Sequence, residues 1–387
     1  MSSPPTTPKA GSAPFGLSRE GCATRRQRLW NTLPSDCQAV LLFEPENLTY
    51  LAGYTPSPFV FRSLGATAAL LLLPDRSILF GDNVARRFLE EAHADEIRIV
   101  PWYDGKTSAP PRRLAVQEAV AKTVEALALS RIAAESRFRS LASPPPAVLV
   151  DPLLHELRRS KDPDEWTLLN RSMRAGEAAH AAAFAQIAPG MSEMDAFRIV
   201  QQAACQALGE PAWVYGDFVS GERCARDRGG PPSNRVIQRG DLVLLDFSVV
   251  VGGYRGDFTN TLVAGGNPSP SQRDLEALCL EALAAGEAAL RAGTPARAVD
   301  AQIRRCFANR GLEDAFPTHS GHGLGLGHPE APFLVRESSE TLRVGDLVAL
   351  EPGLYIPGVA GMRFERNYQI TENGFVLLSH HHLGLTP

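Results

Sequence analysis

The 387-residue sequence lacks the features that mark membrane, secreted and nucleic-acid-binding proteins. No apolar stretch approaches the roughly 18 residues that a membrane-spanning helix needs, and the longest one, at 68–74, suits a buried strand. No long basic run occurs and the net charge is −4, so neither nucleic acid nor an anionic membrane is expected as a partner. The six cysteines stand far apart without a CxxC pair, which argues against a disulfide framework and favours a reduced, cytoplasmic protein.

The composition that remains is typical of a folded globular protein, with 44% hydrophobic and 21% charged residues. At roughly 100–200 residues per domain, the length predicts two domains, with three possible. Residues 1–19 begin with many Ser, Pro and Thr residues, lack the apolar core of a signal peptide and are expected to form a disordered tail. A proline-rich run at 143–146 predicts the linker between an N-terminal domain at 20–150 and a second domain at 151–387.

The spacing of apolar residues predicts alternating strands and helices in both parts of the chain. In the first part we expect strands at 39–43, 68–73, 77–80, 97–100 and 132–135, and helices at 86–92 and 113–127. In the second part we expect one long helix from 154 to 187, strands at 213–218, 242–251 and 254–263, and helices at 270–292 and 296–310. This order predicts an α/β (α+β) protein with helices packed on sheets.

Two predicted hairpins each place an acidic residue after an apolar strand. In the first, Asp246 follows the run at 242–245 and Asp257 lies on the returning strand. A turn centred at 251–252 would place these two aspartates directly opposite each other, about 5 Å apart at Cβ. In the second, Glu351 and Glu365 lie symmetrically about Gly358. Carboxylates that close repel each other unless a cation or a proton lies between them.

A glycine-rich segment with three histidines, His319, His322 and His328, lies between the two hairpins. Its glycines allow close approach of the backbone, and its histidines supply nitrogen ligands or carry protons. Four carboxylates with one imidazole make an oxygen-rich site, which favours manganese, cobalt or iron, with zinc possible. Four acidic ligands also balance two divalent cations about 3.5–4 Å apart, the arrangement that activates water for hydrolysis.

Each of these features also has an ordinary structural explanation. A single Asp after a strand is commonly a turn or cap residue, a Gly-rich stretch with His is commonly a loop, and Glu351 before a proline could simply end a strand. The combination of all of them in one domain is what indicates a metal site. The run His380–His382 is expected to be a solvated terminal segment, and there is no dinucleotide fingerprint, P-loop, G-x-S-x-G or H-E-x-x-H motif.

Several short segments resemble the pita-bread metallopeptidase family, which includes prolidase, aminopeptidase P, methionine aminopeptidase and the non-metal relative creatinase. They are LLDFSVVVGGYRGDFTNT, SGHGLGLGHPEAPF, ALEPGLY and GMRFE, with ENLTYLAG at 46–53 resembling the N-terminal domain of creatinase and RRSKDPDE at 158–165 the entry to the catalytic domain. The resemblance covers residues 35–387. It implies a creatinase-like N-terminal α/β domain followed by a C-terminal pita-bread metallohydrolase domain.

The resemblance also implies roles for individual residues, carried over by position. Five of them are implied to hold two divalent metal ions: Asp246, Asp257, His322, Glu351 and Glu365. Glu351 is further implied to act as general base towards the metal-bridging water, with Arg363 and Tyr355 contacting the substrate or the tetrahedral intermediate. His319 and His328 complete the candidates for substrate binding, and His328 is also a candidate catalytic residue.

Two histidines that are usual in the family are absent from their expected places. One belongs to an SG-x-x-x-x-x-P-H-G-like run before the first ligand strand, where we align it with Gly229. The other follows the GHG motif, where Pro329 stands and His328 precedes it. The basic residues of the first loop, Arg223, Arg226 and Arg228, are either solvated or bind a substrate carboxylate.

The implied activity is hydrolysis of an Xaa-Pro peptide bond in a small peptide by a cytoplasmic homodimer, with manganese as the leading metal. A dipeptide substrate, as for prolidase, is favoured over longer peptides, as for aminopeptidase P, because the cationic loop offers a place for a carboxylate. Three alternatives stay open: a related metal hydrolase or lyase acting on a small non-peptide substrate, a non-catalytic binding module on the same fold, and an unrelated α/β enzyme.

Overall fold

The computed structural model describes residues 16–138 and 146–386. The tail expected at 1–19 therefore lies mostly outside the described residues, and so does most of the proline-rich linker. Residues 16–19 do not continue that tail, because helix α1 (Arg19–Trp30) begins at Arg19 with the Ser18 side chain accepting from the Gly21 N–H. No helix among the residues described is long and apolar enough to cross a membrane.

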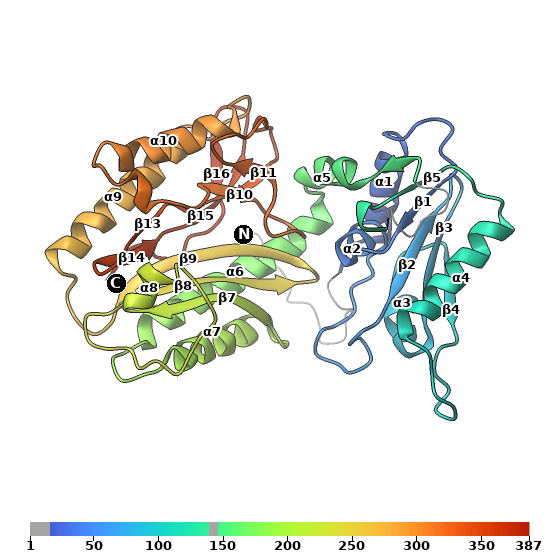
Figure 1. Cartoon of the computed structure of the whole chain (residues 1–387), viewed down its shortest axis with the longest axis horizontal. Helices are drawn as coiled ribbons and strands as arrows, with labels where there is room; N and C mark the ends of the chain where they lie inside the picture. The colour runs from blue at the N-terminus through green and yellow to red at the C-terminus, as the bar shows by residue number, and fades with distance from the viewer. Residues whose placement is uncertain (1–15, 139–145, 387) are drawn as a thin grey trace, which may run out of the picture.

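The N-terminal part is a mixed six-stranded sheet in the order β4-β3-β2-β1-β5-β6 (Figure 1). Its strands are β1 (Ala39–Leu42), β2 (Ala68–Leu72), β3 (Ser77–Asp82), β4 (Glu96–Val100), β5 (Ile132–Ala134) and β6 (Val148–Leu149). Helix α4 (Arg112–Ala126) covers one face, where Val116 and Val120 pack on Leu71 and Phe80. Helices α1, α2 (Pro45–Ala52) and α3 (Arg86–Glu90) pack against the alternate strand residues, and α1 and α2 lie in segments for which no helix is predicted.

The second part contains three short sheets enclosed between two pairs of helices. The sheets have the orders β7-β8-β9, β11-β10-β12-β15-β16 and β13-β14. Their strands are β7 (Trp213–Ser220), β8 (Leu242–Val251), β9 (Tyr254–Val263), β10 (Gly321–Gly323), β11 (Glu330–Leu334), β12 (Leu347–Leu350), β13 (Gly353–Ile356), β14 (Ala360–Arg363), β15 (Arg366–Ile370) and β16 (Phe375–Leu377).

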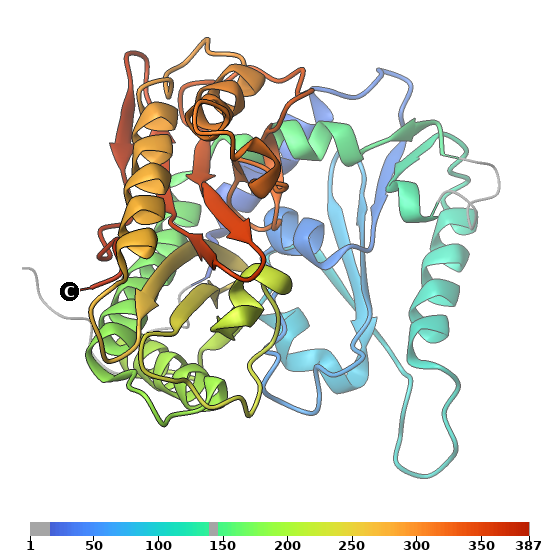
Figure 2. The same cartoon turned by 60° about the vertical axis from the view of Figure 1, so that its left-hand side comes forward.

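Two helices cover each side of these sheets, as Figure 2 shows. Helices α6 (Pro163–Gln186) and α7 (Glu193–Leu208) lie against the β7-β8-β9 sheet, and α9 (Pro270–Glu287) and α10 (Ala296–Ala308) lie on the other side, over β11 to β14. The short helix α8 (Glu222–Arg226) packs on β13 and β14. The strands are therefore held between two helical layers, and their inward side chains converge.

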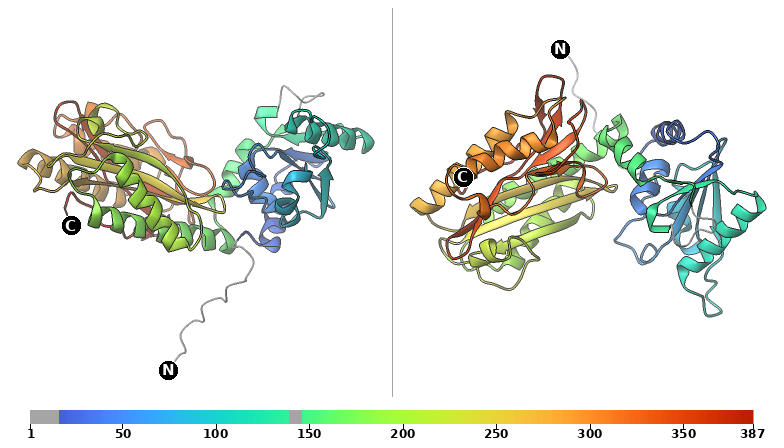
Figure 3. Two further views of the ribbon diagram at one scale, coloured as in Figure 1. Left: turned by 90° about the horizontal axis from the view of Figure 1, so that it is seen from below. Right: turned by 45° about the horizontal axis from the view of Figure 1, so that its top comes forward.

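The long helix expected from 154 to 187 is wrong, because the structure has two helices there. Helix α5 (Asp151–Arg159) ends before Ser160, and α6 starts anew at Pro163. Asp162 and Glu165 form a capping box at this start, and a proline at the first helical position cannot donate to a preceding turn. The break redirects the chain from the N-terminal sheet into the second part (Figure 3).

Candidate metal centre

The β8–β9 hairpin carries the first two candidate ligands in a register that differs from the predicted one. Asp246 lies opposite Thr259, and Asp257 lies opposite Ser248. The expected direct opposition of the two aspartates is therefore wrong. The turn is the two-residue Gly252-Gly253, with φ of 57° and 87°, and its centre lies one residue later than the predicted turn centre.

The shift leaves the two aspartates on one face of the sheet. Moving the turn centre by one residue changes the pairing by two positions, and side chains alternate between faces with a period of two. Asp246 and Asp257 thus become diagonal neighbours, which are still within reach of each other across an antiparallel pair. Any cation that lies between them would be held on the inner face of the hairpin.

The second acidic pair has the predicted symmetry. Strand β12 pairs with β15 and β13 pairs with β14 in one continuous register about Gly358. Between these two ladders, the Phe364 N–H donates to the Pro352 carbonyl at 3.2 Å. Glu351 and Glu365 therefore face each other where the two ladders separate, and both are buried.

His322 reaches the same place from β10, which is squeezed between two strands. A Cβ at Gly321 would lie 2.0 Å from the Ala349 carbonyl oxygen, and one at Gly323 would lie 2.0 Å from that of Ala331. The flanking glycines thus permit the close approach that the sequence indicated. The His322 Nδ1 is 2.9 Å from the Gly323 carbonyl oxygen; a proton on Nδ1 leaves the Nε2 lone pair free to bind a metal.

The five expected ligands converge in overlapping groups. Ligand atoms of Asp246, Asp257 and Glu365 lie within 4.8 Å of one another, as do those of His319, His322 and Glu351. The His322 Nε2 links these groups, at 3.2 Å from Glu351 Oε1 and 3.6 Å from Asp257 Oδ2. Residues from two hairpins and one short strand therefore form one centre.

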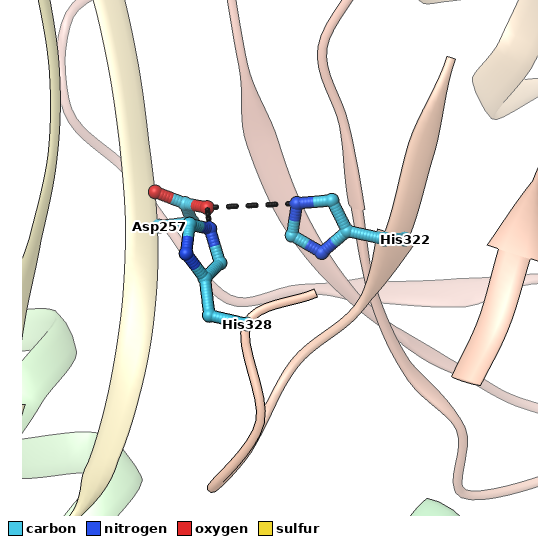
Figure 4. A group of neighbouring side chains, drawn as sticks. All are labelled: Asp257, His322 and His328. Carbon is cyan, nitrogen blue, oxygen red and sulfur yellow. Dashed lines mark hydrogen bonds and ion pairs between the residues drawn. The ribbon is translucent and has the colours of Figure 1, made fainter. Parts of the chain in front are cut away.

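Two further histidines lie at the edge of this centre. The His319 Nε2 is 2.8 Å from Glu351 Oε1, and the His328 Nε2 is 2.6 Å from Asp257 Oδ2. Figure 4 shows His328 and His322 meeting the Asp257 carboxylate from two directions. His328 thus reaches the centre although Pro329, next to it, occupies the position where a family histidine is expected.

Arg363 is the buried cation of the centre. Its guanidinium donates to the Tyr355 hydroxyl at 2.9 Å, to Asp217 Oδ2 at 3.2 Å and, more closely, to Asp246 Oδ2. Its Nε is 3.9 Å from Glu351 Oε2. The guanidinium is therefore surrounded by carboxylates, and their charges raise its pKa well above the ordinary value although burial opposes this.

The raised pKa values of two carboxylates show that the cluster cannot hold all of its carboxylates ionised without a compensating positive charge. Burial raises the pKa of Asp246 to about 7, although Arg363 opposes the rise. Burial, followed by the charges of Asp257, Glu351 and Asp246, raises the pKa of Glu365 well above its ordinary value. A cation or a proton must therefore compensate this cluster.

Hydrogen bonds from histidine act in the opposite direction on the other two carboxylates. Burial would raise the pKa of Glu351, but bonds from His319 and His322 hold it well below the ordinary value. Burial would also raise the pKa of Asp257, but His328 and then His322 keep it low. Glu351 and Asp257 are therefore ionised at neutral pH.

The donor set fits divalent cations. Glu365 Oε1 is buried and has no hydrogen-bond partner among the residues described, while its Oε2 accepts from the Thr259 hydroxyl at 2.6 Å. An unpaired, buried carboxylate oxygen is costly unless it binds a cation or a proton. Carboxylate oxygens with one imidazole are ligands that suit manganese, cobalt, iron or zinc.

Asp217 and Thr259 belong to the surroundings of the centre but are absent from the predicted set. Asp217 lies on β7 directly opposite Asp246, and Thr259 lies on β9 opposite the same residue. The sequence offered one signal for Asp217, namely an acidic residue next to Phe218 within a predicted strand. No sequence signal separates Thr259 from the other threonines of its strand.

In the loop after β7, the alignment of the family histidine with Gly229 stays a prediction, while the arginines of the loop differ in their contacts. Arg223 pairs with Glu193 and Asp227, and Arg226 pairs with Asp227. In the part of the chain that is described, only Arg228 of the three arginines has no carboxylate partner, and it is exposed, with φ of 63°.

The sequence predicted a solvated segment for the three histidines near the C-terminus, but one of them is not solvated. His380 and His382 are exposed, but His381 is buried, with its Nε2 3.3 Å from the Thr259 carbonyl oxygen. Its ring lies 4.7 Å from that of His180. None of the three belongs to a group of metal-ligand atoms in the described residues.

Comparisons with known proteins agree with this geometry. Residues 167–372 match the family described as "Metallopeptidase family M24", and residues 25–144 match the "Creatinase/Prolidase N-terminal domain". An uncharacterized peptidase of Bacillus subtilis is 31% identical over 273 residues, which are 68% of this chain and 76% of that protein. The Xaa-Pro dipeptidase of Pyrococcus furiosus is 31% identical over 225 residues, 58% of this chain and 64% of that protein.

A solved structure agrees over almost the whole chain. The Xaa-Pro dipeptidase of Bacillus anthracis superposes with a TM-score of 0.79 at 25% identity, covering 94% of this chain and 99% of that chain. The predicted fold class, a creatinase-like α/β domain followed by a pita-bread domain, is confirmed.

Proposed function

Because the chain belongs to metallopeptidase family M24, we propose that it hydrolyses Xaa-Pro peptide bonds, foremost in dipeptides, with two divalent cations as cofactors. The chain is a metallopeptidase; its substrate and its metal content are the proposal. The observation that carries the proposal is the convergence of four buried or half-buried carboxylates and His322 in adjoining groups, within each of which the ligand atoms lie within 4.8 Å of one another.

We assign the metal ions to Asp246, Asp257, His322, Glu351 and Glu365. Cations bound there supply a water activated for attack at neutral pH and stabilise the oxyanion that develops on the substrate. Binding must displace the protons that the cluster otherwise holds, because the neighbouring carboxylates raise the pKa of His322 to about 9 against the effect of burial.

The remaining residues act on the water and the substrate. Glu351 accepts the proton of the attacking water, because its low pKa keeps its carboxylate ionised and able to act as a base. Arg363 and Tyr355 face the centre and bind the substrate or the developing oxyanion. His319 and His328, at 38% and 28% side-chain exposure, lie where they can reach both the centre and solvent, so they bind the substrate. His328 also carries protons.

A dipeptide remains the favoured substrate because Arg228 is exposed and has no carboxylate partner among the residues described. Its guanidinium could bind the C-terminal carboxylate that a dipeptide presents close to the scissile bond. Two similar proteins, those of Pyrococcus furiosus and Bacillus anthracis, are named Xaa-Pro dipeptidases. Longer peptides and small non-peptide substrates are outcomes that the experiment below distinguishes.

Further properties complete the proposal. We place the domain boundary at 150/151, with the N-terminal domain at 20–150 and the catalytic domain at 151–387, because α5 begins at Asp151 and contacts β11. Manganese is the proposed metal, since four of the five ligands are carboxylates. We also propose that the protein is a homodimer and that it is cytoplasmic. The six free cysteines support the proposed location.

The experiment measures metal content and turnover together. Purified protein is loaded with Mn²⁺, analysed for metal and assayed on Ala-Pro, Leu-Pro and a tripeptide. We expect two metal equivalents and dipeptide cleavage, with Mn²⁺ affinity and cleavage both reduced at least tenfold in Glu365→Gln, since loss even of a residue that only supports a metal ligand costs about 10–100-fold. The control is Glu372→Gln, which removes an exposed glutamate near the same hairpin.

Each other outcome selects a different function. Metal with cleavage of the tripeptide but not of dipeptides would replace the dipeptidase with an aminopeptidase. Metal without cleavage of any peptide would favour a small non-peptide substrate. Protein that binds no metal would leave only the binding module.

A further inference from the structure

Asp217 is a fifth acidic residue at the centre, beside the four carboxylates among the proposed ligands. It projects from β7 directly opposite Asp246 on β8. Its Oδ2 accepts from Arg363 at 3.2 Å, and its Oδ1 accepts from the Gly230 N–H at 2.7 Å. At 34% side-chain exposure it is the most accessible carboxylate around that guanidinium, whose other carboxylate partners, Asp246 and Glu351, are proposed metal ligands.

Gly229 leaves the space that Asp217 fills. A Cβ at position 229 would lie 2.1 Å from Asp217 Oδ2, which is closer than any real contact. The conformation of Gly229 is one that other residues adopt, since its φ is not in the left-handed region. The three heavy atoms nearest to such a Cβ all belong to the Asp217 carboxylate, so a side chain at this position would displace that carboxylate.

We propose that Asp217 is a positioning residue, which keeps the Arg363 guanidinium at the centre when cations bind Asp246, and that Gly229 is required for its placement. The inference rests on the proposed metal centre. Arg363 is only 6% exposed, so its charge needs a carboxylate partner at all times.

The reason lies in competition for the same oxygens. Cations bound to Asp246 and Glu351 take up the negative charge that otherwise faces Arg363. Asp217 takes no part in the clusters of ligand atoms, so its carboxylate remains available to the guanidinium. Without Asp217, cation binding would leave a buried guanidinium with only the neutral Tyr355 hydroxyl as a close side-chain partner, which makes cation binding less favourable.

The first test is a double-mutant cycle on Mn²⁺ affinity, measured by calorimetric titration of metal-free protein. Asp217→Asn is expected to weaken Mn²⁺ binding about tenfold, the lower end of the range for a residue that supports a metal ligand. In an Arg363→Met background the same change should alter affinity by at most about twofold, as for independent sites. Asp227→Asn is the control. It removes a carboxylate from the loop that holds Gly229, and this carboxylate pairs with Arg223 and Arg226 rather than with Arg363.

A second variant reaches the same carboxylate from the other side. Gly229→Ala should weaken Mn²⁺ binding about as much as Asp217→Asn, and the two changes together should cost no more than either alone. Gly374→Ala is the matched control, since a Cβ there meets nothing within 4 Å.

Two results would overturn the proposal. One is unchanged Mn²⁺ affinity in Asp217→Asn and Gly229→Ala. The other is an equal loss with and without Arg363, which would show that Asp217 acts on the cations only through its charge. Neither readout needs peptide turnover, so an inactive protein that follows the cycle would contradict the proposed substrate and leave this inference intact.

Discussion

Two buried histidines, His180 and His381, lie in apolar surroundings behind the centre. The His180 ring stacks on Phe247 with centroids 4.6 Å apart, and its Nε2 is 3.3 Å from the Phe258 carbonyl oxygen. Burial, with a smaller contribution from the charge of Arg366, lowers the pKa of His180 to about 4 against the opposing effect of the bond to Phe258. His180 therefore stays neutral in the folded protein at pH values where the unfolded chain is protonated.

This difference predicts that the protein loses stability on the acid side. Between about pH 6.5 and 4 the unfolded state binds the extra proton, so stability falls as pH falls through this window and is unaffected above it. When the pH falls from about 7.5 to 5, His180 alone should lower the free energy of unfolding by about 2 kcal/mol. Urea unfolding of metal-free protein at both pH values should show that loss shrinking by about 2 kcal/mol in His180→Phe relative to wild type.

The comparison variant is His155→Gln, which changes an exposed histidine of α5 and should leave the pH dependence as in wild type. An acid-induced loss of the same size in His180→Phe and wild type would contradict the prediction. His381 and Arg366 face His180 and stay unchanged in both variants; because the charge of His180 also lowers the pKa of His381, the difference reports His180 together with its effect on His381.

At the same scale, the sequence could predict the ligands but not their surroundings. Asp246, Asp257 and Glu365 are recognisable because each follows or precedes an apolar strand beside a glycine turn. Asp217 belongs to a strand whose pairing brings it opposite Asp246, and that pairing depends on which strands become neighbours. Such contacts arise from tertiary packing, which no local pattern encodes.

At the scale of elements, α6 is fitted to the hairpin that carries the aspartates. Its inner face consists of small residues, including Ala175, Gly176 and Ala179, and a Cβ at Gly176 would lie 2.3 Å from Phe258 Cε2. Phe258 is fully buried and follows Asp257 directly. The absence of a side chain at Gly176 thus lets the helix lie close to β9.

Gly176→Ala should therefore destabilise the protein although it improves helix propensity. Ala in place of Gly ordinarily stabilises a helix interior by up to about 1 kcal/mol. Here the added methyl group should cost about 1–3 kcal/mol by overpacking against Phe258. Free energies of unfolding in urea test this, with the reverse change Ala181→Gly on the exposed face of α6 costing up to about 1 kcal/mol. Stabilisation by Gly176→Ala would show that helix and hairpin do not meet this closely.

The elements also show which parts of the fold were predictable. Symmetry about Gly358 gave the correct register for the second acidic pair, because a single glycine marks that turn. At Gly252-Gly253 two adjacent glycines allow turn centres that differ by one residue, and the predicted pairing of Asp246 with Asp257 was wrong. The break at Ser160 was missed although local signals mark it: the run from Arg158 to Glu165 is polar apart from Pro163, and Asp162 and Glu165 form the capping box that starts α6.

At the scale of the whole molecule, the two domains share one hydrophobic core and a buried ionic cluster. The core includes Tyr50 from α2 and Leu168 from α6, together with Leu326 from the histidine loop. Arg25 of α1 is fully buried, donates to the Tyr50 carbonyl at 2.7 Å and binds Asp164 at 2.9 Å. This contact joins the first helix of the N-terminal domain to the start of α6, where the chain enters the second domain.

Arg25→Met should consequently destabilise the whole chain by about 3 kcal/mol, because it leaves the acidic residues at the start of α6 without their buried cation. Arg28→Met provides the matched control: Arg28 lies one turn further along α1, contacts Asp162 and is 33% exposed, so its loss should cost less than about 1 kcal/mol. Urea unfolding followed by tryptophan fluorescence measures both, since Trp30 and Trp166 lie on either side of the contact. Equal losses in the two variants would mean that burial of Arg25 contributes nothing to joining the domains.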